Sequence, residues 1–443
     1  MNAPGIILTC IFALIICVTP RVWAAIGTMA ATIYLTQQQE VNLGGFHFTA
    51  IRLILLVGIS RVIASRESRQ FRFNAIDKTV MAYSLVGGAI YSLRLGTSEA
   101  LTGQLGQCYD TLLSYFVFRG FISGYSELES FIEKLIPLIV PLSLFMVVEA
   151  MTGNNLFQFI GGMPPPERDG GFRCHGAFRG PFSAGIFGAA LLPLFVGFGQ
   201  ATGRYLLAAL GTGAAFTIMM TSHSSGPLMA FVFGVGALAL WPMHQRMRQF
   251  RRGLVVFLIG SEIVMKAHVW FLIAKVSDLT GGDGWYRSQL INQFFVYYKR
   301  WWFMGTEETG DWMPTGLHIG DKIFADICNA YVNAGVSGGL LTFILYILIF
   351  VRCFQALGRA LKSIQDSDGV SEKFVWCVGC ALVAHAAAQI SVQYWDQLYV
   401  AWWGFVAIIS SLTSELLNRE RVVEEQEFVS AEEFTSGTGA TPA

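Results

Sequence analysis

Charged residues are scarce in this sequence. They account for 14% of its 443 residues, whereas a soluble domain carries roughly 25%. Hydrophobic residues account for 53%, and the mean hydropathy is +0.51. So few polar side chains do not cover the surface of a soluble globular protein of this size. The same composition excludes disorder over most of the chain.

The sequence also lacks an excess of charge of either sign. Its 30 Lys and Arg residues equal its 30 Asp and Glu residues in number, which removes the overall attraction that a basic chain has for nucleic acid. The 7 His and 8 Cys residues are too dispersed to indicate a metal site or a disulfide framework. We therefore expect no nucleic-acid partner, no metal and no cofactor.

Hydrophobic runs, by contrast, are long and frequent. A run of roughly 17–25 apolar residues crosses a bilayer as a helix, and a helix satisfies its own backbone groups where no water is present. Pro20 and Arg21 separate two short runs at the start of the chain. The sequence thus predicts an all-α integral membrane protein with about 12–13 transmembrane helices and a large, partly helical periplasmic loop. The runs lie near residues 5–19, 21–36, 47–65, 79–95, 100–120, 134–151, 182–199, 203–221, 225–242, 253–274, 334–354, 373–391 and 397–415.

Basic residues cluster in three of the predicted loops, which fall on one face if the spans alternate. Loops rich in Lys and Arg usually stay in the cytoplasm, so we expect that face and the C-terminus to be cytoplasmic. The opposite, periplasmic face then receives two long segments, 152–181 and 275–333. The basic residues are Arg61, Arg66, Arg69, Arg72 and Lys78, then Arg246, Arg248, Arg251 and Arg252, and finally Arg352, Arg359, Lys362 and Lys373.

This pattern divides the chain into three parts. Residues 1–151 are predicted to form N-terminal transmembrane helices, and residues 152–421 to form a core that includes both outer segments. Residues 422–443 are rich in glutamate and finish with small, polar residues. That composition is typical of a solvated, disordered tail.

The first outer segment carries arginines on the face where positive charge is normally rare. Arg173 and Arg179 lie among several glycines, which allow a backbone to approach a ligand closely. Arginine binds phosphate oxygens through two parallel hydrogen bonds. The segment therefore predicts a phosphate site, although a solvated loop with stray charges has the same composition.

The second outer segment combines aromatic residues with carboxylates and amides. Tryptophan rings pack on the apolar faces of sugar rings, while Asp, Asn and Glu accept hydrogen bonds from hydroxyl groups. We therefore predict a sugar-binding surface here. The alternative is an aromatic belt at the membrane interface, where Trp and Tyr also gather. The candidate residues are Trp301, Trp302, Trp312, His318, Asp326 and Asn329.

A small polar connection lies between two of the predicted spans. It contains Ser222, Ser224 and Ser225, whose hydroxyls could bind a phosphate or a sugar, although a tight turn between two helices has the same composition. Within the spans themselves, Glu149 and His385 are ionisable. Such residues are functional candidates by default in a membrane, and a structural role is equally compatible with them.

Several of these segments follow one another as a series of recognisable blocks over residues 165–350. Their order and spacing resemble the O-antigen ligase and polysaccharide polymerase superfamily. The blocks are Arg173, Gly176 and Phe178 ahead of Phe182-Ser-Ala-Gly-Ile-Phe-Gly188, then Thr221-Ser-His-Ser-Ser-Gly-Pro227, then Trp285-Tyr-Arg287, Trp301-Trp-Phe-Met-Gly305-Thr, Trp312, Asp326-Ile-Cys-Asn329-Ala-Tyr331 and Gly335-Val-Ser-Gly-Gly-Leu-Leu.

The resemblance implies a metal-independent, inverting membrane glycosyltransferase in exopolysaccharide or O-antigen biosynthesis. Such an enzyme takes an oligosaccharide from an undecaprenyl diphosphate carrier and joins it to a glycan acceptor. It works at the periplasmic face of the bacterial inner membrane, with the lipid bilayer around it. By position in the motifs, Arg173 and Arg287 resemble the family's diphosphate-binding arginines, and Arg179 is expected to assist them.

The sequence departs from the family pattern at two places. The family often has a histidine late in the large loop that activates the acceptor hydroxyl, whereas here the matching block begins with Asp326 and His318 lies earlier. Both are therefore candidates for the catalytic base. The serine-rich block lacks the arginine that the family often carries there. Ser222, Ser224 and Ser225, with the tryptophans and Asn329, are expected to contact the sugar or the acceptor.

Three functions stay open at this point. The first is a polymerase or ligase of a surface polysaccharide. The second is a transporter or flippase for a lipid-linked sugar, which would also need outer arginines and aromatic residues. The third is a non-catalytic scaffold whose acidic tail binds other polysaccharide assembly proteins.

Overall fold

The computed structural model describes residues 1–43, 46–65, 73–168, 170–275, 283–319, 322–364 and 369–437. Arg66, Arg69 and Arg72 of the first basic cluster lie outside the described residues, as does the last part of the predicted tail, residues 438–443.

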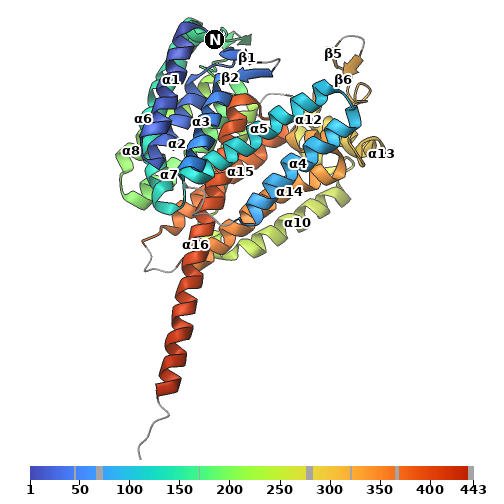
Figure 1. The fold of residues 1–443 in the computed structure, drawn as a ribbon. Coiled ribbons are helices and arrows are strands. Elements are labelled where there is room, and N and C mark those ends of the chain that lie inside the picture. Colours follow the sequence, from blue (N-terminus) through green and yellow to red (C-terminus); the bar gives the residue numbers. More distant parts are fainter. Residues whose placement is uncertain are drawn as a thin grey trace, which may run out of the picture.

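Helices dominate the described chain and pack side by side as a bundle (Figure 1). Most of them are apolar over much of their surface, as expected for helices that contact either one another or lipid. The longer helices are α1 (Ala3–Val18), α2 (Arg21–Tyr34), α3 (Ala50–Ala64), α4 (Ala75–Leu95), α5 (Ser98–Phe121), α6 (Tyr125–Thr152), α7 (Pro181–Thr202), α8 (Tyr205–Thr221), α9 (Ser225–Ala239), α10 (Met247–Val264), α12 (Gly284–Val296), α14 (Ala330–Ser363), α15 (Glu372–Ser391) and α16 (Asp396–Gly437). The short ones are α13 (Tyr298–Trp301) and the 3-10 turns η2 (Leu156–Ile160), η3 (Trp241–Arg246) and η4 (Val269–Phe271).

Five of the described helices are long and apolar enough to cross a membrane, namely α6, α7, α14, α15 and α16. The number is six if α9 and the η3–α10 stretch, which meet at a bend of 74°, form one span. Helices α1 and α8 are apolar but shorter, with 16 and 17 residues. The protein is thus a multi-pass, all-α membrane protein. The count differs from about 12–13 because several of the expected spans are short or carry charged side chains.

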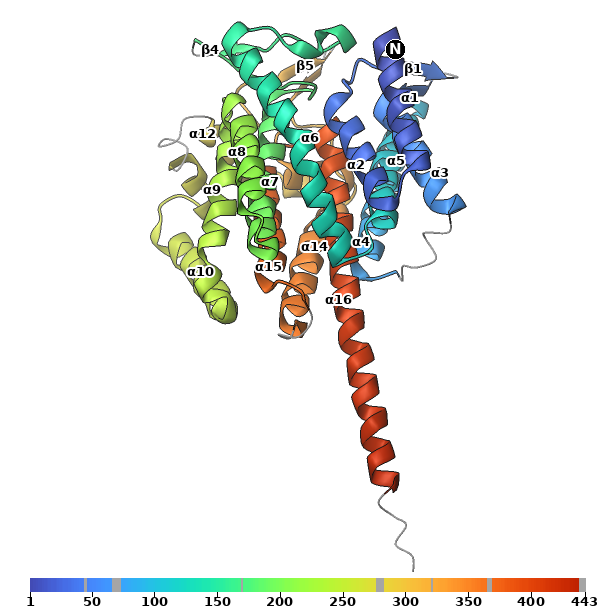
Figure 2. The same cartoon turned by 90° about the vertical axis from the view of Figure 1, so that its left-hand side faces the viewer.

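Within the described residues, three small antiparallel strand pairs lie outside the helices. They are β1–β2 (Glu40–Leu43 with Phe46–Thr49), β3–β4 (Glu167–Arg168 with Gly171–Phe172) and β5–β6 (Leu317–Ile319 with Lys322–Phe324). Figure 2 shows β4, β5 and α12 toward one end of the bundle. The bend between α9 and α10, the end of α14 and the start of α15 lie toward the other end, from which α16 projects. The two outer segments of the sequence therefore share one end of the molecule.

Helix α16 continues to Gly437, well beyond the bundle (Figure 2). Residues 422–437, for which we expected disorder, are therefore helical in the structure. Extending an existing helix needs no new nucleus, and the many Glu and Arg residues beyond Leu417 are good helix formers.

Small residues allow the central helices to approach closely. A Cβ atom on Gly188 of α7 would lie only 2.6 Å from the carbonyl oxygen of Ala215 on α8. Glycine at such a contact lets two backbones pack directly against each other, as in many membrane proteins. In α14, Gly339 has a φ of +73° and interrupts the regular helix. These positions shape the core around which the outer segments are arranged.

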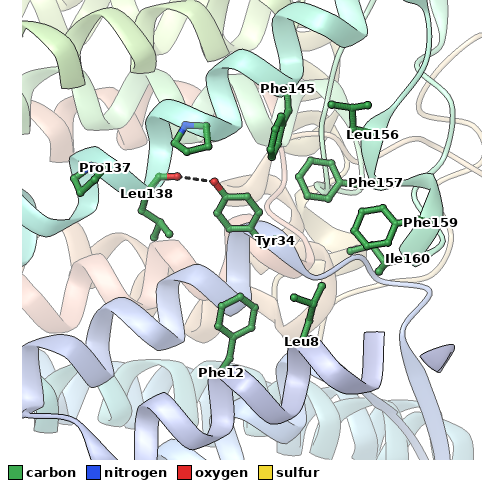
Figure 3. Close-up of a pocket in the computed structure, with 11 residues that line it drawn as sticks. Leu8, Phe12, Tyr34, Pro137, Leu138, Phe145, Leu156, Phe157, Phe159 and Ile160 are labelled. Carbon is green, nitrogen blue, oxygen red and sulfur yellow. Dashed lines mark hydrogen bonds between the residues drawn. The ribbon is translucent and has the colours of Figure 1, made fainter. Parts of the chain in front are cut away.

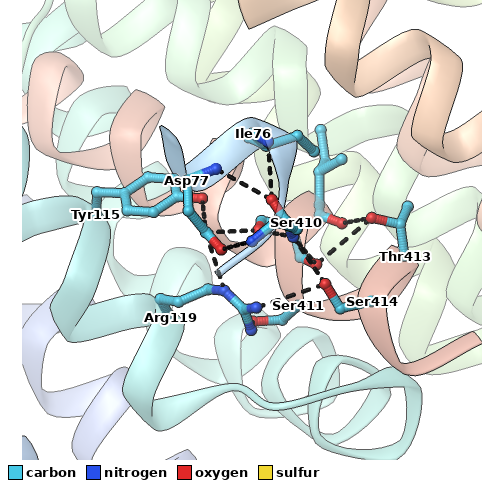
Figure 4. Close-up of polar contacts among 10 residues, drawn as sticks. Ile76, Asp77, Tyr115, Arg119, Ser410, Ser411, Thr413 and Ser414 are labelled. Carbon is cyan, nitrogen blue, oxygen red and sulfur yellow. Dashed lines mark hydrogen bonds and ion pairs between the residues drawn. The ribbon is translucent and has the colours of Figure 1, made fainter. Parts of the chain in front are cut away.

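A buried ion pair between α4 and α5 is part of a polar cluster that also includes serines of α16 (Figure 4). Arg119 Nε donates to Asp77 Oδ1 at 3.3 Å, and the side chains of Asp77 and Arg119 are 0% and 2% exposed. Asp77 Oδ1 also accepts from Tyr115 and Ser410, at 2.5 and 2.9 Å. Asp77 Oδ2 accepts from the backbone N–H of Asn74, at 2.7 Å. Both charges are out of water, so each depends on these contacts. The hydrogen bonds and the ion pair thereby hold α4, α5 and α16 together.

Candidate functional site

Two arginines from distant parts of the chain meet neighbouring serines at the start of α9. Arg173 Nη2 donates to Ser224 Oγ at 2.7 Å, and Arg287 Nη2 donates to Ser225 Oγ at 3.1 Å. Arg173 comes from the first outer segment, and Arg287 lies in the first turn of α12, in the second outer segment. The fold thus brings together two of the three arginines that the sequence predicts to bind phosphate. We refer to Arg173, Arg287, Ser224 and Ser225 as the arginine site.

The backbone at this point forms a sharp turn between two helices. Helix α8 ends at Thr221, His223 adopts a left-handed conformation with a φ of +42°, and α9 begins at Ser225. The Ser224 side chain makes no capping hydrogen bond to the helix. The first N–H groups of a helix lack partners within it, and its N-terminus carries partial positive charge. An anion is therefore favoured by the helix end as well as by the arginines.

Neither guanidinium at the arginine site forms an ion pair with a carboxylate in the part of the chain that the structure describes. Burial lowers the pKa of Arg287, and the nearby side chains of Cys328 and Asp283 oppose that shift. Burial also lowers the pKa of Arg173, and repulsion from Arg168 adds to the effect. The Nε atom of Arg173 is buried and has no hydrogen-bond partner. Two half-buried guanidiniums that form no ion pair with a carboxylate among the described residues are chemically suited to an anion.

The loop that carries Arg173 is held by a buried carboxylate from α6. Glu149, which is 1% exposed, accepts from the backbone N–H groups of His175 and Gly176, at 3.2 and 2.9 Å. The Asn155 side chain donates to the carbonyl oxygen of Gly176 at 2.7 Å. The backbone N–H of Cys174 donates to the carbonyl oxygen of Thr221 at 3.0 Å. These bonds fix the backbone on both sides of the contact between Arg173 and Ser224.

Asp326 lies against the same first turn of α12. The Tyr286 hydroxyl donates to the backbone carbonyl of Asp326 at 3.0 Å and lies 3.1 Å from its backbone N–H. Asp326 is exposed, but neighbouring protein displaces part of the water around its carboxyl group and raises its pKa. Burial, and then the charge of Asp326, raise the pKa of Tyr286 to about 12. A carboxylate with a raised pKa near the Tyr286 hydroxyl is suited to accept a proton.

Arg179, the third predicted phosphate ligand, has a different partner. Its Nη1 atom donates to Asp396 Oδ2 at 3.0 Å, at the start of α16. The structure therefore ties Arg179 to a carboxylate rather than to the arginine site. The sequence does not indicate this pairing because 217 residues separate the two positions.

Four residues expected to contact sugar or acceptor are buried instead, and their predicted contacts are corrected here. Ser222 is fully buried, and its hydroxyl donates to the carbonyl oxygen of Met219 at 2.6 Å. Asn329 caps α14 by accepting from the backbone N–H groups of Tyr331 and Val332. Both side chains already form hydrogen bonds with nearby backbone groups, so they stabilise the fold.

The other two buried residues are tryptophans. Trp301 is 3% exposed and stacks on Phe294 with ring centroids 3.8 Å apart, and Trp312 is 1% exposed and stacks on Tyr297. Their rings form a small apolar core beneath the second outer segment. Trp302 and His318 are exposed, and Trp302 is the only one of the three predicted sugar-contacting tryptophans that faces outward in the structure.

Sequence reasoning assigned no specific role to Glu149 and did not single out Tyr286 or Cys328. The signal for Glu149 was its presence as an ionisable residue in an apolar span. Cys328 lies between the positions of Asp326 and Asn329 in the sequence, and its thiol interacts electrostatically with both Asp326 and Arg287. Burial is the main cause that raises the pKa of this thiol to about 11.

The molecule also has an apolar pocket between α1, α2, α6 and η2 (Figure 3). Its volume is about 420 Å³, and it is lined by Leu8, Phe12 and similar side chains. Its one polar side chain, Tyr34, donates its hydroxyl to the carbonyl oxygen of Leu138 at 2.7 Å. The pocket therefore has the character of a site for hydrocarbon rather than for a charged group.

Among the described residues, no group of three or more His, Cys, Asp or Glu side chains is arranged to hold a metal ion. No protein-family model matches this chain, and no curated protein matches it.

Proposed function

We propose that this protein is a membrane glycosyltransferase that polymerises or ligates oligosaccharide units carried on a lipid diphosphate such as undecaprenyl diphosphate. The observation that carries the proposal is the meeting of Arg173 and Arg287 at adjacent serines on the N-terminus of α9. Two guanidiniums that form no ion pair in the described part of the chain, together with a helix end, match the charge of a diphosphate.

In the proposed reaction, an acceptor hydroxyl attacks the anomeric carbon of the donor sugar. The new glycosidic bond forms as the bond from that carbon to the diphosphate oxygen breaks, which inverts the anomeric centre. The electron pair leaves with the lipid diphosphate. Arg173 and Arg287 stabilise the charge that builds up on the leaving group, and a contact of this kind contributes about 2–4 kcal/mol in the transition state.

The proton of the acceptor hydroxyl needs a base. Asp326 is the better candidate because its backbone is hydrogen-bonded to Tyr286, the neighbour of Arg287 in α12, and because its raised pKa makes it a stronger base than an ordinary carboxylate. His318 lies on the β5–β6 hairpin, where it pairs with Ile323. It is the second candidate, and Asp326→Asn and His318→Ala variants separate the two.

We further propose that the arginine site faces the periplasm of a bacterial inner membrane and that α16 ends in the cytoplasm. The positive-inside tendency supports this orientation, because the basic α9–α10 bend, the end of α14 and the start of α15 lie toward the end from which α16 projects (Figure 2). In this arrangement the shorter helices, such as α1 and α8, also lie in the bilayer. That gives the protein about 12–13 spans.

The test is transfer by the purified full-length protein in proteoliposomes, with an undecaprenyl-diphosphate-linked oligosaccharide as donor. A ladder of products indicates a polymerase, and a single shift of an added acceptor indicates a ligase. Movement of the donor across the bilayer without a new bond identifies a transporter instead. Absence of both transfer and movement, with the protein folded, favours a scaffold that binds other polysaccharide assembly proteins.

Arginine variants connect that activity to the site. Arg173→Ala and Arg287→Ala are each expected to lower the transfer rate by about 10²–10³-fold. Arg300→Ala is the matched control, because Arg300 is an exposed arginine of the same outer segment that pairs with Asp311 at 2.8 Å. Wild-type rates in both site variants would refute the proposed role of the arginine site.

A further inference from the structure

An exposed tryptophan lies on the connection between α15 and α16. Trp395 is 47% exposed, and the guanidinium of Arg179 lies over its ring, 5.8 Å from the centroid. Arg179 in turn pairs with Asp396, whose side chain is 24% exposed. The Trp395 ring thus lies next to Arg179, which donates hydrogen bonds, and Asp396, which accepts them.

This group of residues is continuous with the arginine site. A Cβ atom on Gly226, in the first turn of α9, would lie 3.0 Å from Val392 Cγ2, so that turn and the α15–α16 connection are in direct contact. Trp395 follows Val392 by three residues, which limits their Cα atoms to a separation of about 11 Å. Arg179 belongs to the same loop as Arg173. The side chain of Gln397 joins the two elements, since it donates to Ala177 O at 2.7 Å and accepts from Arg179 N at 3.3 Å.

The backbone at this point is held in an unusual conformation. Asp396 has a φ of +51°, which residues other than glycine seldom adopt. Such a conformation costs about 1–3 kcal/mol and persists only where surrounding contacts enforce it. Here those contacts are the ion pair with Arg179 and the buried side chain of the next residue, Gln397. Together they fix the backbone next to Trp395, on the connection that touches the first turn of α9.

We propose that Trp395, Arg179 and Asp396 form a subsite for a sugar ring of the lipid-linked glycan. The inference rests on the proposed function and adds to it the surface that holds the sugar next to the diphosphate. The indole face packs on the apolar C–H face of a pyranose, Arg179 donates to ring hydroxyls, and Asp396 accepts from them.

The experiment compares a sugar-bearing ligand with a sugar-free one on the full-length protein in proteoliposomes. The probes are the undecaprenyl-diphosphate-linked oligosaccharide donor and inorganic diphosphate as an inhibitor. Trp395→Ala is expected to raise KM for the donor about 5- to 20-fold, with a smaller change in kcat and no change in inhibition by diphosphate. Arg287→Ala is expected to weaken the binding of both the donor and inorganic diphosphate.

Two further variants make the result specific. Trp395→Phe, which keeps an aromatic face, should recover part of the donor affinity and guards against a folding defect in the alanine variant. Trp23→Ala is the matched control, because Trp23 is also 47% exposed and has the Lys134 ammonium 5.6 Å from its ring centroid, yet belongs to α2. It should behave as wild type.

If Trp395→Ala also behaves as wild type while the wild-type protein is active, the sugar subsite is wrong and the proposed function stands. The subsite is also wrong if Trp395→Ala weakens inhibition by diphosphate as much as it weakens binding of the donor. If the wild-type protein transfers no sugar, the proposed function fails and this inference fails with it.

Discussion

The buried ion pair between Asp77 and Arg119 allows a prediction that does not depend on the function. Replacing Asp77 by Ala removes a carboxylate that accepts from Tyr115, Arg119, Ser410 and the Asn74 backbone. The Arg119 side chain, 2% exposed, is left without that charge. Figure 4 shows that these partners come from α4, α5 and α16, so the variant loosens three helices at once.

The size of the effect follows from burial. Removing one partner of a buried ion pair typically costs 3–5 kcal/mol, since it leaves an uncompensated charge out of water. We therefore expect Asp77→Ala to lower the free energy of unfolding by about 3–5 kcal/mol. An exposed pair contributes only about 0–1 kcal/mol. Asp311→Ala is accordingly the control, because Asp311 and Arg300 are 50% and 39% exposed.

Thermal unfolding of the detergent-solubilised protein, followed by tryptophan fluorescence at a fixed heating rate, measures the difference. Asp77→Ala should unfold at a clearly lower temperature than Asp311→Ala. The double variant Asp77→Leu/Arg119→Met should recover much of the loss, because it removes the buried charge of Arg119 together with that of Asp77. The reasoning is refuted if Asp77→Ala and Asp311→Ala unfold at the same temperature.

Three further predictions concern the candidate site. If Asp326 is the base, the transfer rate falls as the pH drops through its pKa, which partial burial raises above 3.8. The Asp326→Asn variant should be about 10²–10⁴-fold slower. A rate–pH profile that is the same in the variant and the wild type would exclude this role. Glu149→Ala leaves two buried backbone N–H groups without acceptors and should lower stability by about 1–3 kcal/mol, to be checked by thermal unfolding, where an unchanged transition contradicts it. Trp301→Ala should lower the free energy of unfolding by about 3–5 kcal/mol because the ring is buried. Trp302 is exposed, so Trp302→Ala should change that free energy by less than about 0.5 kcal/mol. Equal unfolding temperatures for the two variants would show that the assigned burial is wrong.

Much of the fold follows from hydropathy. Long apolar runs predict helices, and the runs near 134–151, 182–199, 334–354, 373–391 and 397–415 coincide with α6, α7, α14, α15 and α16. The count of spans was less predictable, since apolar composition does not fix where a helix begins or ends. The bend between α9 and α10 shows this, because no single window of sequence reveals a change of direction of 74°.

The candidate site was predictable by residue type but not by arrangement. Arginines on the outer segments predicted a site that binds an anion, and Arg173 and Arg287 do meet at Ser224 and Ser225. Arg179, which has the same local composition around it, pairs with Asp396 instead.

What the sequence determines by itself is therefore the kind of protein: a helical membrane protein with arginines and aromatic residues concentrated in two segments. Both properties depend only on composition within short stretches, which the hydrophobic effect and the needs of the backbone convert directly into helices. Only the tertiary structure decided which cations stay unpaired and which tryptophans are buried. Those outcomes depend on contacts between residues as much as 217 positions apart, and no local pattern contains such contacts.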